Sequence, residues 1–290
     1  MRALYDIAAP AKLNLFLHIT GKRADGYHLL QSVFALIDWC DTLHFELRND
    51  GAISREDLGT PLPAQDLIVR AAKALQSVSA TRQGVHIAVD KKIPAQAGMG
   101  GGSSDAASCL LALNRLWQLQ LSLEQLSRIG LALGADVPFF LAGRNAWVEG
   151  IGEKITPLDL ATARYLVVKP QDGLQTGLIF GHPALRTDTK NATISGFAAN
   201  PRSFGGNDLQ DVAQRLCPGV SHAIEWLRSH GLDGRMTGSG SAVFAWGSGG
   251  FEEIDLGTTP STFQARWCSG LEVHPLLGWA SSDGLPVSGD

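Results

Sequence analysis

A run of glycine and serine residues constrains this chain more than any other feature. From Pro94 to Ala107 the sequence is Pro-Ala-Gln-Ala-Gly-Met-Gly-Gly-Gly-Ser-Ser-Asp-Ala-Ala. Glycines carry no side chain, so consecutive backbone N–H groups can converge on one anion. A helix opening at Ser103 and Ser104 would add the partial positive charge of its N-terminus. The pattern predicts a phosphate-binding loop between a strand and a helix; the alternative is a flexible Gly/Ser hinge.

The common nucleotide-binding signatures do not describe this loop. A P-loop requires Gly-Lys followed by Ser or Thr, and that combination is absent from the sequence. A dinucleotide-binding fingerprint requires a third glycine, whereas Gly98 and Gly100 are followed by Ser103 at that place. The catalytic-loop and magnesium-loop signatures of protein kinases are also missing. These absences leave a nucleotide loop of another lineage.

Length and charge exclude several classes of protein. The 290 residues predict about two domains at roughly 150 residues each. The 24 basic and 28 acidic side chains give a net charge of −4, so the chain lacks the basic stripe of a nucleic-acid-binding protein. No apolar run reaches the roughly 18 residues of a membrane span. Four cysteines lie far apart, at Cys40, Cys109, Cys217 and Cys268, which is typical of reduced thiols in a cytoplasmic protein.

Local patterns predict a mixture of strands and helices. Alternating apolar residues favour strands, and capping residues such as Asp66 and Ser122 mark helix starts. Strands are expected at 13–19, 32–38, 42–47, 85–89, 165–168 and 242–246, with a turn at 25–26 and a hairpin at 145–155. Helices are expected at 67–75, 103–117, 122–134, 208–216 and 218–229, and weakly patterned loops at 182–206. The domains are expected at 1–150 and 151–280, followed by a flexible tail at 281–290.

Three segments, taken together, resemble the motifs of the GHMP kinase superfamily, a group of small-molecule kinases that hold ATP in a glycine-serine loop. Pro10-Ala-Lys-Leu-Asn14 resembles the first motif, Pro94 to Ala107 the second, and Thr237-Gly-Ser-Gly-Ser-Ala-Val-Phe244 the third. They occur in the order of the family and span most of the chain. Gly21 to His28 and Gly134 to Phe140 resemble more narrowly the branch whose acceptor alcohol carries a cytidine diphosphate group.

The resemblance implies an α/β (α+β) fold of two domains, with the glycine-rich phosphate loop in the N-terminal one and a sheet with helices in the C-terminal one. It also implies transfer of phosphate from ATP, with Mg²⁺, to the tertiary 2-hydroxyl of a cytidylylated methylerythritol, a step toward isoprenoid precursors. The match is thin at 182–206 and 248–270. The residues implied for ATP binding are Pro94, Ala95, Gln96, Ala97, Gly98, Met99, Gly100, Gly101, Gly102, Ser103 and Ser104.

Two residues are candidates for catalysis. An attacking hydroxyl must lose its proton, and a positioned carboxylate can accept it. Asp136, in Gly-Ala-Asp-Val-Pro, would on its own be read as a turn residue, and the resemblance implies that it is the catalytic base. Lys12 would on its own be a solvated lysine at a strand start. Next to Asp136, its ammonium group could keep the carboxylate ionised.

Five residues are candidates for binding the acceptor. A base stacked on an aromatic ring gains about 1–3 kcal/mol, and the resemblance implies that Tyr27 and Phe180 enclose cytosine, with His28 on its polar edge. On their own, Tyr27 and His28 would be a packed tyrosine and a surface histidine. Asn14 is two residues from Lys12 on a strand, so both side chains point the same way. Thr176 belongs to a Thr-x-x-x-aromatic stretch of the family.

The sequence assigns no ligands to magnesium, which commonly relies on phosphates, waters and one or two protein oxygens. Ser104 and Asp105 are each candidates for supplying one such protein oxygen. The rival functions are another GHMP kinase, acting on mevalonate, homoserine or a sugar, and a non-catalytic relative of these enzymes. Retention of both Lys12 and Asp136 argues against the second rival. The oligomeric state is unknown from the sequence.

Overall fold

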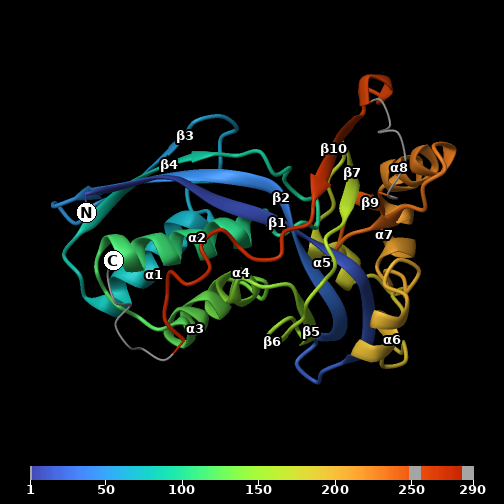
Figure 1. Ribbon diagram of the computed structural model, residues 1–290, viewed down its shortest axis with the longest axis horizontal. Coiled ribbons are helices and arrows are strands. Elements are labelled where there is room, and N and C mark those ends of the chain that lie inside the picture. Colours follow the sequence, from blue (N-terminus) through green and yellow to red (C-terminus); the bar gives the residue numbers. More distant parts are fainter. Residues whose placement is uncertain (1, 248–255, 283–290) are drawn as a thin grey trace.

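The computed structural model describes residues 2–247 and 256–282, and within them the chain builds two sheets with helices around them (Figure 1). The first, six-stranded sheet has the order β3-β4-β2-β5-β6, with β1 paired to β2. Its strands are β1 (Ala3–Lys22), β2 (His28–Arg48), β3 (Ile53–Asp57), β4 (Gly84–Asp90), β5 (Ala146–Gly150) and β6 (Lys154–Pro157). Four helices cover one face of this sheet: α1 (Leu67–Ser79), α2 (Gly101–Leu116), α3 (Leu123–Leu133) and α4 (Val137–Ala142).

The second sheet, four-stranded within the described residues, has the order β10-β7-β9-β8. Its strands are β7 (Arg164–Pro170), β8 (Arg235–Met236), β9 (Val243–Trp246) and β10 (Phe263–Ser269). The helices on this side are α5 (Thr176–Phe180), α6 (Ile194–Ala199), α7 (Gln210–Leu216) and α8 (Pro218–Ser229), with a short 3₁₀ turn at Leu256–Thr258. The cavity described below lies where the two parts meet.

Strand β1 contributes to each of the buried apolar clusters that hold these parts together. Ile7 packs with the helices of the first sheet. Leu13 lies in a central cluster with Val167 and Phe244 of the second sheet. Ile19 lies in a further cluster with α7 and α8. Successive apolar residues of β1 therefore pack into different clusters, which fixes the position of the polar residues between them, such as Lys12 and Asn14.

Several local predictions are confirmed by the backbone. The Asp66 carboxylate accepts a hydrogen bond from the Val69 amide and begins α1. Ser122 and Gln125 form the expected capping box at the start of α3. Such caps depend on residues close together in sequence, so the sequence can specify them without knowledge of the fold.

Three predictions of local structure were wrong. The strands expected at 32–38 and 42–47 are one strand, β2, because a bulge lets it continue: Pro10 pairs with Cys40, whereas Ala11 pairs with Ile37. Helix α2 begins at Gly101 rather than Ser103, capped by Gly100 with φ +73°. The loop expected at 182–206 contains α6, which is capped by Thr193, begins at Ile194 and is held by the buried ring of Phe197.

After β10 the chain returns to the first sheet. The Leu271 amide donates to the Leu36 carbonyl over 2.8 Å, and the His274 amide donates to the Gly143 carbonyl over 2.9 Å. Farther on, the Ser281 carbonyl accepts a hydrogen bond from the Leu123 amide over 2.9 Å. Residues 283–290 of the expected tail lie outside the described residues, and the domain boundary at residue 150 stays a prediction.

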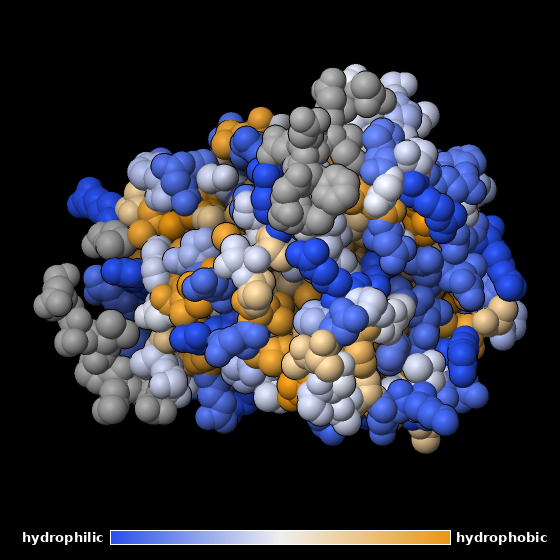
Figure 2. All heavy atoms as spheres, turned by 45° about the vertical axis from the view of Figure 1, so that its right-hand side comes forward, coloured by the Kyte–Doolittle hydropathy of each residue, from blue (hydrophilic) through white to orange (hydrophobic). Residues whose placement is uncertain are grey.

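A helix that spans a membrane must be long and predominantly apolar. Among residues 2–247 and 256–282, no helix has the length and apolar character needed to cross a membrane. On the face seen in Figure 2, apolar side chains form separate patches among hydrophilic ones, which predominate on the right-hand side of the view.

His274 is expected to make stability depend on pH. Its side chain is 1% exposed, its Nδ1 accepts from the Leu276 amide, and burial lowers its pKa to about 4. The unfolded chain takes up this proton as the pH falls below about 6.5, while the folded chain does not, so stability is lost between pH ~6.5 and ~4, by about 2–3 kcal/mol. Urea unfolding at several pH values measures this loss.

The matched variant is His274→Gln, which keeps an acceptor for the Leu276 amide and removes the titrating group. It should lose less stability than the wild-type protein between neutral and acidic pH. Equal losses in the two proteins would mean that His274 does not carry the effect.

Candidate active site

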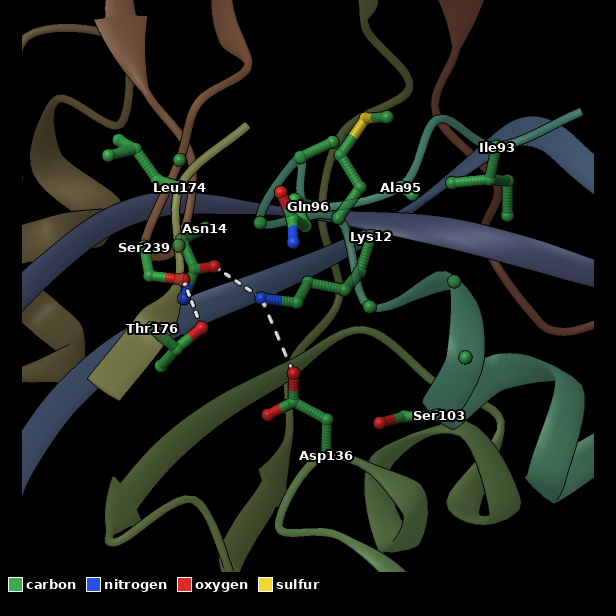
Figure 3. A pocket seen from close by; sticks show the side chains of 18 of the residues that line it. Lys12, Asn14, Ile93, Ala95, Gln96, Ser103, Asp136, Leu174, Thr176 and Ser239 are labelled. Carbon is green, nitrogen blue, oxygen red and sulfur yellow. Dashed lines mark hydrogen bonds and ion pairs between the residues drawn. The ribbon is translucent and has the colours of Figure 1, made fainter. Parts of the chain in front are cut away.

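A cavity of about 710 Å³ lies between the two parts of the molecule. Residues 93–103, the phosphate loop expected from the sequence with the first residues of α2, form one wall, and Thr176, Phe180 and Ser239 line another. Lys12 and Asp136 lie between these walls, and their side chains point toward each other (Figure 3). The fold therefore gathers side chains from β1, α4, α5 and two glycine-rich turns around one space.

The backbone of the phosphate loop is fixed from two sides. On one side, the Lys12 amide of β1 donates to the Met99 carbonyl over 3.0 Å. On the other, the Ser241 and Ala242 amides donate to the Gln96 and Ala97 carbonyls. These hydrogen bonds explain why the first and third motifs lie beside the second despite their separation in sequence.

Two glycines of the loop have no tolerable substitute. Gly98 has φ +72°, and a Cβ there would lie 2.2 Å from the Thr237 carbonyl oxygen. Gly100 has φ +73°, and a Cβ there would lie 3.0 Å from the Phe140 ring and 3.3 Å from Cε of Lys12. The positive φ favours glycine in both places, and a side chain at residue 100 would crowd Phe140 and Lys12.

Helix α2 offers the cavity an uncapped N-terminus. Gly100, its N-cap, provides no capping side chain, so the first amides of the helix keep the partial positive charge that such ends carry. Ser103 lines the cavity. Ser104 is completely buried, and its hydroxyl has no hydrogen-bond partner among the described residues. Of the expected loop residues, Ser104 is thus the one whose side chain lies behind the wall.

Lys12 is a buried cation beside a partly exposed carboxylate. Its residue is 3% exposed, and its Nζ lies 3.6 Å from Oδ2 of Asp136. The same ammonium donates to Oδ1 of Asn14 over 2.5 Å and lies 4.5 Å from the centre of the Phe34 ring. Burial lowers the pKa of Lys12, and the charge of Asp136 opposes this shift. Lys12 and Asp136 therefore form an ion pair that lines the cavity.

The geometry of this pair depends on the position of Asp136 at a helix start and on Asn14, which holds the Lys12 ammonium. Asp136 is the N-cap of α4, whose first turn contains Pro138, and proline is favoured there because its missing N–H is not needed. Asn14 is held by its Nδ2, which donates to the Ser32 hydroxyl over 2.8 Å, and by its amide, which donates to the Thr237 hydroxyl over 2.8 Å. The side-chain oxygen of Asn14, Oδ1, is thereby turned toward the Lys12 ammonium.

The other end of the cavity carries aromatic and hydroxyl groups. Phe180 lines it, and its ring centre lies 5.4 Å from that of His28 with 37° between the planes. The Thr176 and Ser239 hydroxyls are 2.8 Å apart. Tyr27 is 60% exposed. Of the residues expected to bind the acceptor, Asn14, Thr176 and Phe180 line the cavity, His28 contacts one of them, and Tyr27 lies outside the wall.

Sequence reasoning missed a buried charged cluster below the phosphate loop. Lys91 Nζ lies 2.5 Å from Oδ2 of Asp105 and also pairs with Asp41. The only sequence signal was the position of Lys91 in the short segment between the strand expected at 85–89 and the loop that begins at Pro94. Its partners come from residues 50 positions before it and 14 after it, which no local pattern connects.

Comparison with known proteins gives the family. The model of the GHMP kinases N terminal domain matches residues 66–144, and that of the GHMP kinases C terminal domain matches residues 187–253. A 4-diphosphocytidyl-2-C-methyl-D-erythritol kinase of Albidiferax ferrireducens is 69% identical, over 99% of this chain and 99% of that protein. This chain belongs to the 4-diphosphocytidyl-2-C-methyl-D-erythritol kinase family. The kinase of the same name from Variovorax paradoxus is 64% identical, over 97% of this chain and 100% of that protein.

A solved structure of this family has the same fold. The crystal structure of a 4-(cytidine 5'-diphospho)-2C-methyl-D-erythritol kinase matches with a TM-score of 0.77 and 32% identity, covering 91% of this chain and 98% of that one. The prediction of an α/β (α+β) GHMP kinase fold with N- and C-terminal domains is confirmed. The chain is a small-molecule kinase, and membership of this kinase family implies the use of ATP.

Proposed function

We propose that this chain transfers the γ-phosphoryl group of ATP to the 2-hydroxyl of 4-diphosphocytidyl-2-C-methyl-D-erythritol, a reaction of the non-mevalonate route to isoprenoid precursors. The observation that carries the proposal is the Lys12–Asp136 pair, 3.6 Å apart, in a cavity that also contains the phosphate loop and Phe180. Such an arrangement gives a nucleotide, a proton acceptor and an aromatic surface one shared space.

The phosphate loop and the start of α2 bind the triphosphate. The amides that begin α2 point their partial positive charge at the cavity and lack a capping side chain. A helix N-terminus in this state favours phosphate oxygens. The residues present therefore fit ATP, with Ser103 and the backbone of residues 94–102 as its contacts and Ser104 supporting the helix from behind.

Asp136 accepts the proton and Lys12 stabilises the charge. The substrate hydroxyl oxygen forms a bond to the γ-phosphorus, the bond from that phosphorus to the β-phosphate oxygen breaks, and ADP leaves. The hydroxyl proton passes to the Asp136 carboxylate. The Lys12 ammonium, fixed by Asn14 over 2.5 Å, lies where negative charge develops on the attacking oxygen, so positioning and electrostatics supply the rate.

Magnesium fits the site through the nucleotide rather than through a protein cage. No group of three or more His, Cys, Asp or Glu side chains that could hold a metal ion is present among the described residues. Mg²⁺ usually keeps several waters and takes one or two carboxylates together with substrate phosphates. When bound to ATP it would neutralise phosphate charge. Asp105 lines the cavity, but its Oδ2 is held by Lys91, which makes it a poor candidate for a ligand.

The aromatic end of the cavity binds the cytidine group. Phe180 supplies a face for the cytosine ring, and His28, 5.4 Å away between ring centres, supplies polar atoms at its edge. Thr176 and Ser239, joined through their hydroxyls, offer further hydrogen bonds. Tyr27 is 60% exposed and becomes a second stacking surface only when its side chain turns toward the bound base.

Mass spectrometry of the product tests the proposal. The protein is incubated with ATP, Mg²⁺ and 4-diphosphocytidyl-2-C-methyl-D-erythritol, and the acceptor should gain about 80 Da, the mass of one phosphoryl group replacing a proton. Mevalonate and homoserine, acceptors without a cytidine group, are the controls and should remain unchanged. Phosphorylation of either control in place of the cytidylylated acceptor would overturn the proposed substrate.

Phe180→Ala should weaken acceptor binding selectively. Loss of one stacking surface costs about 1–3 kcal/mol, so KM for the cytidylylated acceptor should rise by roughly 5- to 150-fold, while KM for ATP stays unchanged. Steady-state kinetics with each substrate varied in turn measures both constants. Leu178→Ala, which removes a 59% exposed side chain from the same helix, is the control and should change neither. An equal rise of both KM values in the Phe180 variant would contradict a role at the base.

A further inference from the structure

Three charged residues below the phosphate loop take no part in the mechanism above. Asp41 is completely buried, Asp105 is 2% exposed, and the side chain of Lys91 between them is 11% exposed. Buried charges are costly unless they are paired and hydrogen-bonded. A cluster of this kind beside a binding loop therefore calls for a physical explanation.

The cluster first fixes the point where the chain enters the loop. The Asp41 Oδ1 atom accepts hydrogen bonds from the Lys92 amide over 2.5 Å and the Ile93 amide over 2.7 Å. These amides directly precede Pro94, the first residue of the loop. Because Asp41 belongs to β2 in the middle of the first sheet, the entry point is tied to a central strand of that sheet.

The cluster also fixes the point where the chain leaves the loop. Asp105 lies in the second turn of α2, and its Oδ2 accepts a hydrogen bond from Lys91 Nζ over 2.5 Å. The same ammonium donates to Oδ2 of Asp41. One ammonium group thus joins the residue before the loop to the helix after it, across the segment whose amides face the cavity.

The balance of charge makes Lys91 indispensable to this link. Oδ1 of Asp105 has no hydrogen-bond partner among the described residues. Burial raises the pKa of Asp105 to about 8, with Lys91 opposing the shift and Asp41 adding to it. Burial lowers the pKa of Lys91, but the charges of Asp105 and Asp41 outweigh this effect and raise it overall. Without the ammonium, the two buried carboxylates would lose the cation that they share, and repulsion between their like charges would favour protonation of one of them.

We infer that Lys91 is a positioning residue for ATP: by holding Asp41 and Asp105 together, it sets the distance between the two ends of the phosphate loop. This inference rests on the proposed function of the loop. Lys91 and Asp105 also line the cavity, and the role inferred for Lys91 is exerted through the backbone of residues 94–102. Loss of the link lets α2 and the end of β4 separate, so the loop amides no longer converge.

Kinetics of Lys91→Met and Asp105→Ala test the inference. Each variant should raise KM for ATP by about 10- to 100-fold, the range that small displacements of positioned groups can produce, and leave KM for the acceptor unchanged. Calorimetric titration with ADP, without acceptor, should show the same loss of affinity. Asp105→Asn keeps an acceptor for Lys91 and should fall between Asp105→Ala and the wild-type protein, because neutral hydrogen bonds are weaker than charge-assisted ones.

The double variant Lys91→Met/Asp105→Ala guards against misfolding. It removes the ammonium together with one carboxylate, and the remaining Asp41 carboxylate keeps two amide donors. Both single changes break the same link, the one between Lys91 and Asp105. The double variant should therefore bind ADP about as well as the single variant with the lower affinity. An effect equal to the product of the single effects would contradict a shared link.

Lys92→Met is the matched control. Lys92 is the next residue, its side chain is 54% exposed and pairs with Asp90 over 3.1 Å, and its contribution to the cluster is a backbone amide that the substitution preserves. It should bind ADP and ATP like the wild-type protein. Unchanged ADP affinity in both Lys91→Met and Asp105→Ala would overturn the inference, even if these variants lost thermal stability.

The two proposals fail in different ways. If the wild-type protein does not phosphorylate the cytidylylated acceptor, the proposed function is wrong, while ADP affinity still reports on Lys91. If it does, and the variants bind ADP normally, the positioning role is wrong and the function stands. Hydrogen exchange of the amides in residues 98–103 gives a further reading, since it should quicken in both single variants and not in Lys92→Met.

Discussion

Asp136→Asn should lower kcat by about 10²- to 10⁴-fold, the contribution typical of a positioned general base. Asparagine has the same size and also suits the N-cap position of α4, where the Asp136 side chain makes no capping hydrogen bond, but it cannot accept the proton of the attacking hydroxyl. It also removes the negative charge that opposes the burial-induced lowering of the Lys12 pKa. KM for both substrates should change much less than kcat. Steady-state kinetics combined with urea unfolding separates loss of chemistry from loss of structure.

Asp90→Asn is the control for this experiment. Asp90 is also paired with a lysine, over 3.1 Å, and its side chain is 37% exposed, against 30% for Asp136. It lies at the end of β4, and it does not line the cavity in the described part of the chain. The control should keep its activity. A folded Asp136→Asn protein with near-normal kcat would remove Asp136 from the chemistry.

Lys12→Met should lower kcat by about 10²- to 10³-fold, the cost of removing one group that stabilises charge in the transition state. Methionine retains an unbranched side chain against the Phe34 ring, so the loss is mainly that of the ammonium group. Part of the effect should appear as weaker ATP binding, because the Lys12 side chain lines the same cavity as the phosphate loop. Single-turnover kinetics distinguishes the two contributions.

The pH profile gives an independent measurement of Lys12. Burial lowers its pKa from the usual range of a lysine, so the ammonium is lost, and kcat falls, at a lower pH than for an exposed lysine near 10.4. Lys12→Arg should remove this alkaline decline, since a guanidinium group stays charged, although its absolute rate is lower. An alkaline decline that persists unchanged in Lys12→Arg would assign it to another group.

The features that could be predicted from the sequence are those written into short segments. Glycines at 98 and 100–102 predict a backbone that can approach an anion closely. In the structure, Gly98 and Gly100 have positive φ. Lys12 and Asp136 were found through resemblance to motifs, since alone each has an ordinary explanation. Caps such as Asp66 also depend on neighbours in sequence, and they lie where the local pattern indicated.

What could not be predicted depends on partners distant in sequence. The continuity of β2 requires a bulge opposite Pro10, and nothing in residues 32–47 alone reveals it. Helix α6 is short and depends on the burial of Phe197 against Phe16 and Phe204, with ring centres 5.9 Å and 5.7 Å away. The cluster around Lys91 joins β2, α2 and the segment that follows β4. In each case tertiary contacts decide the outcome, and local propensity does not contain them.

The paired strands β1 and β2 run through both parts of the molecule as one antiparallel ribbon, with pairs from Ala3–Glu46 to Lys22–His28. The far end of β1 is anchored to the second part, where the Ile19 amide donates to Asp208 over 2.6 Å. A rotation of one part of the molecule against the other would have to distort this pair of strands. Lys12 lies near the middle of β1. We therefore expect side chains and short turns at the rim of the cavity to admit the substrate, while the Lys12 ammonium stays in place.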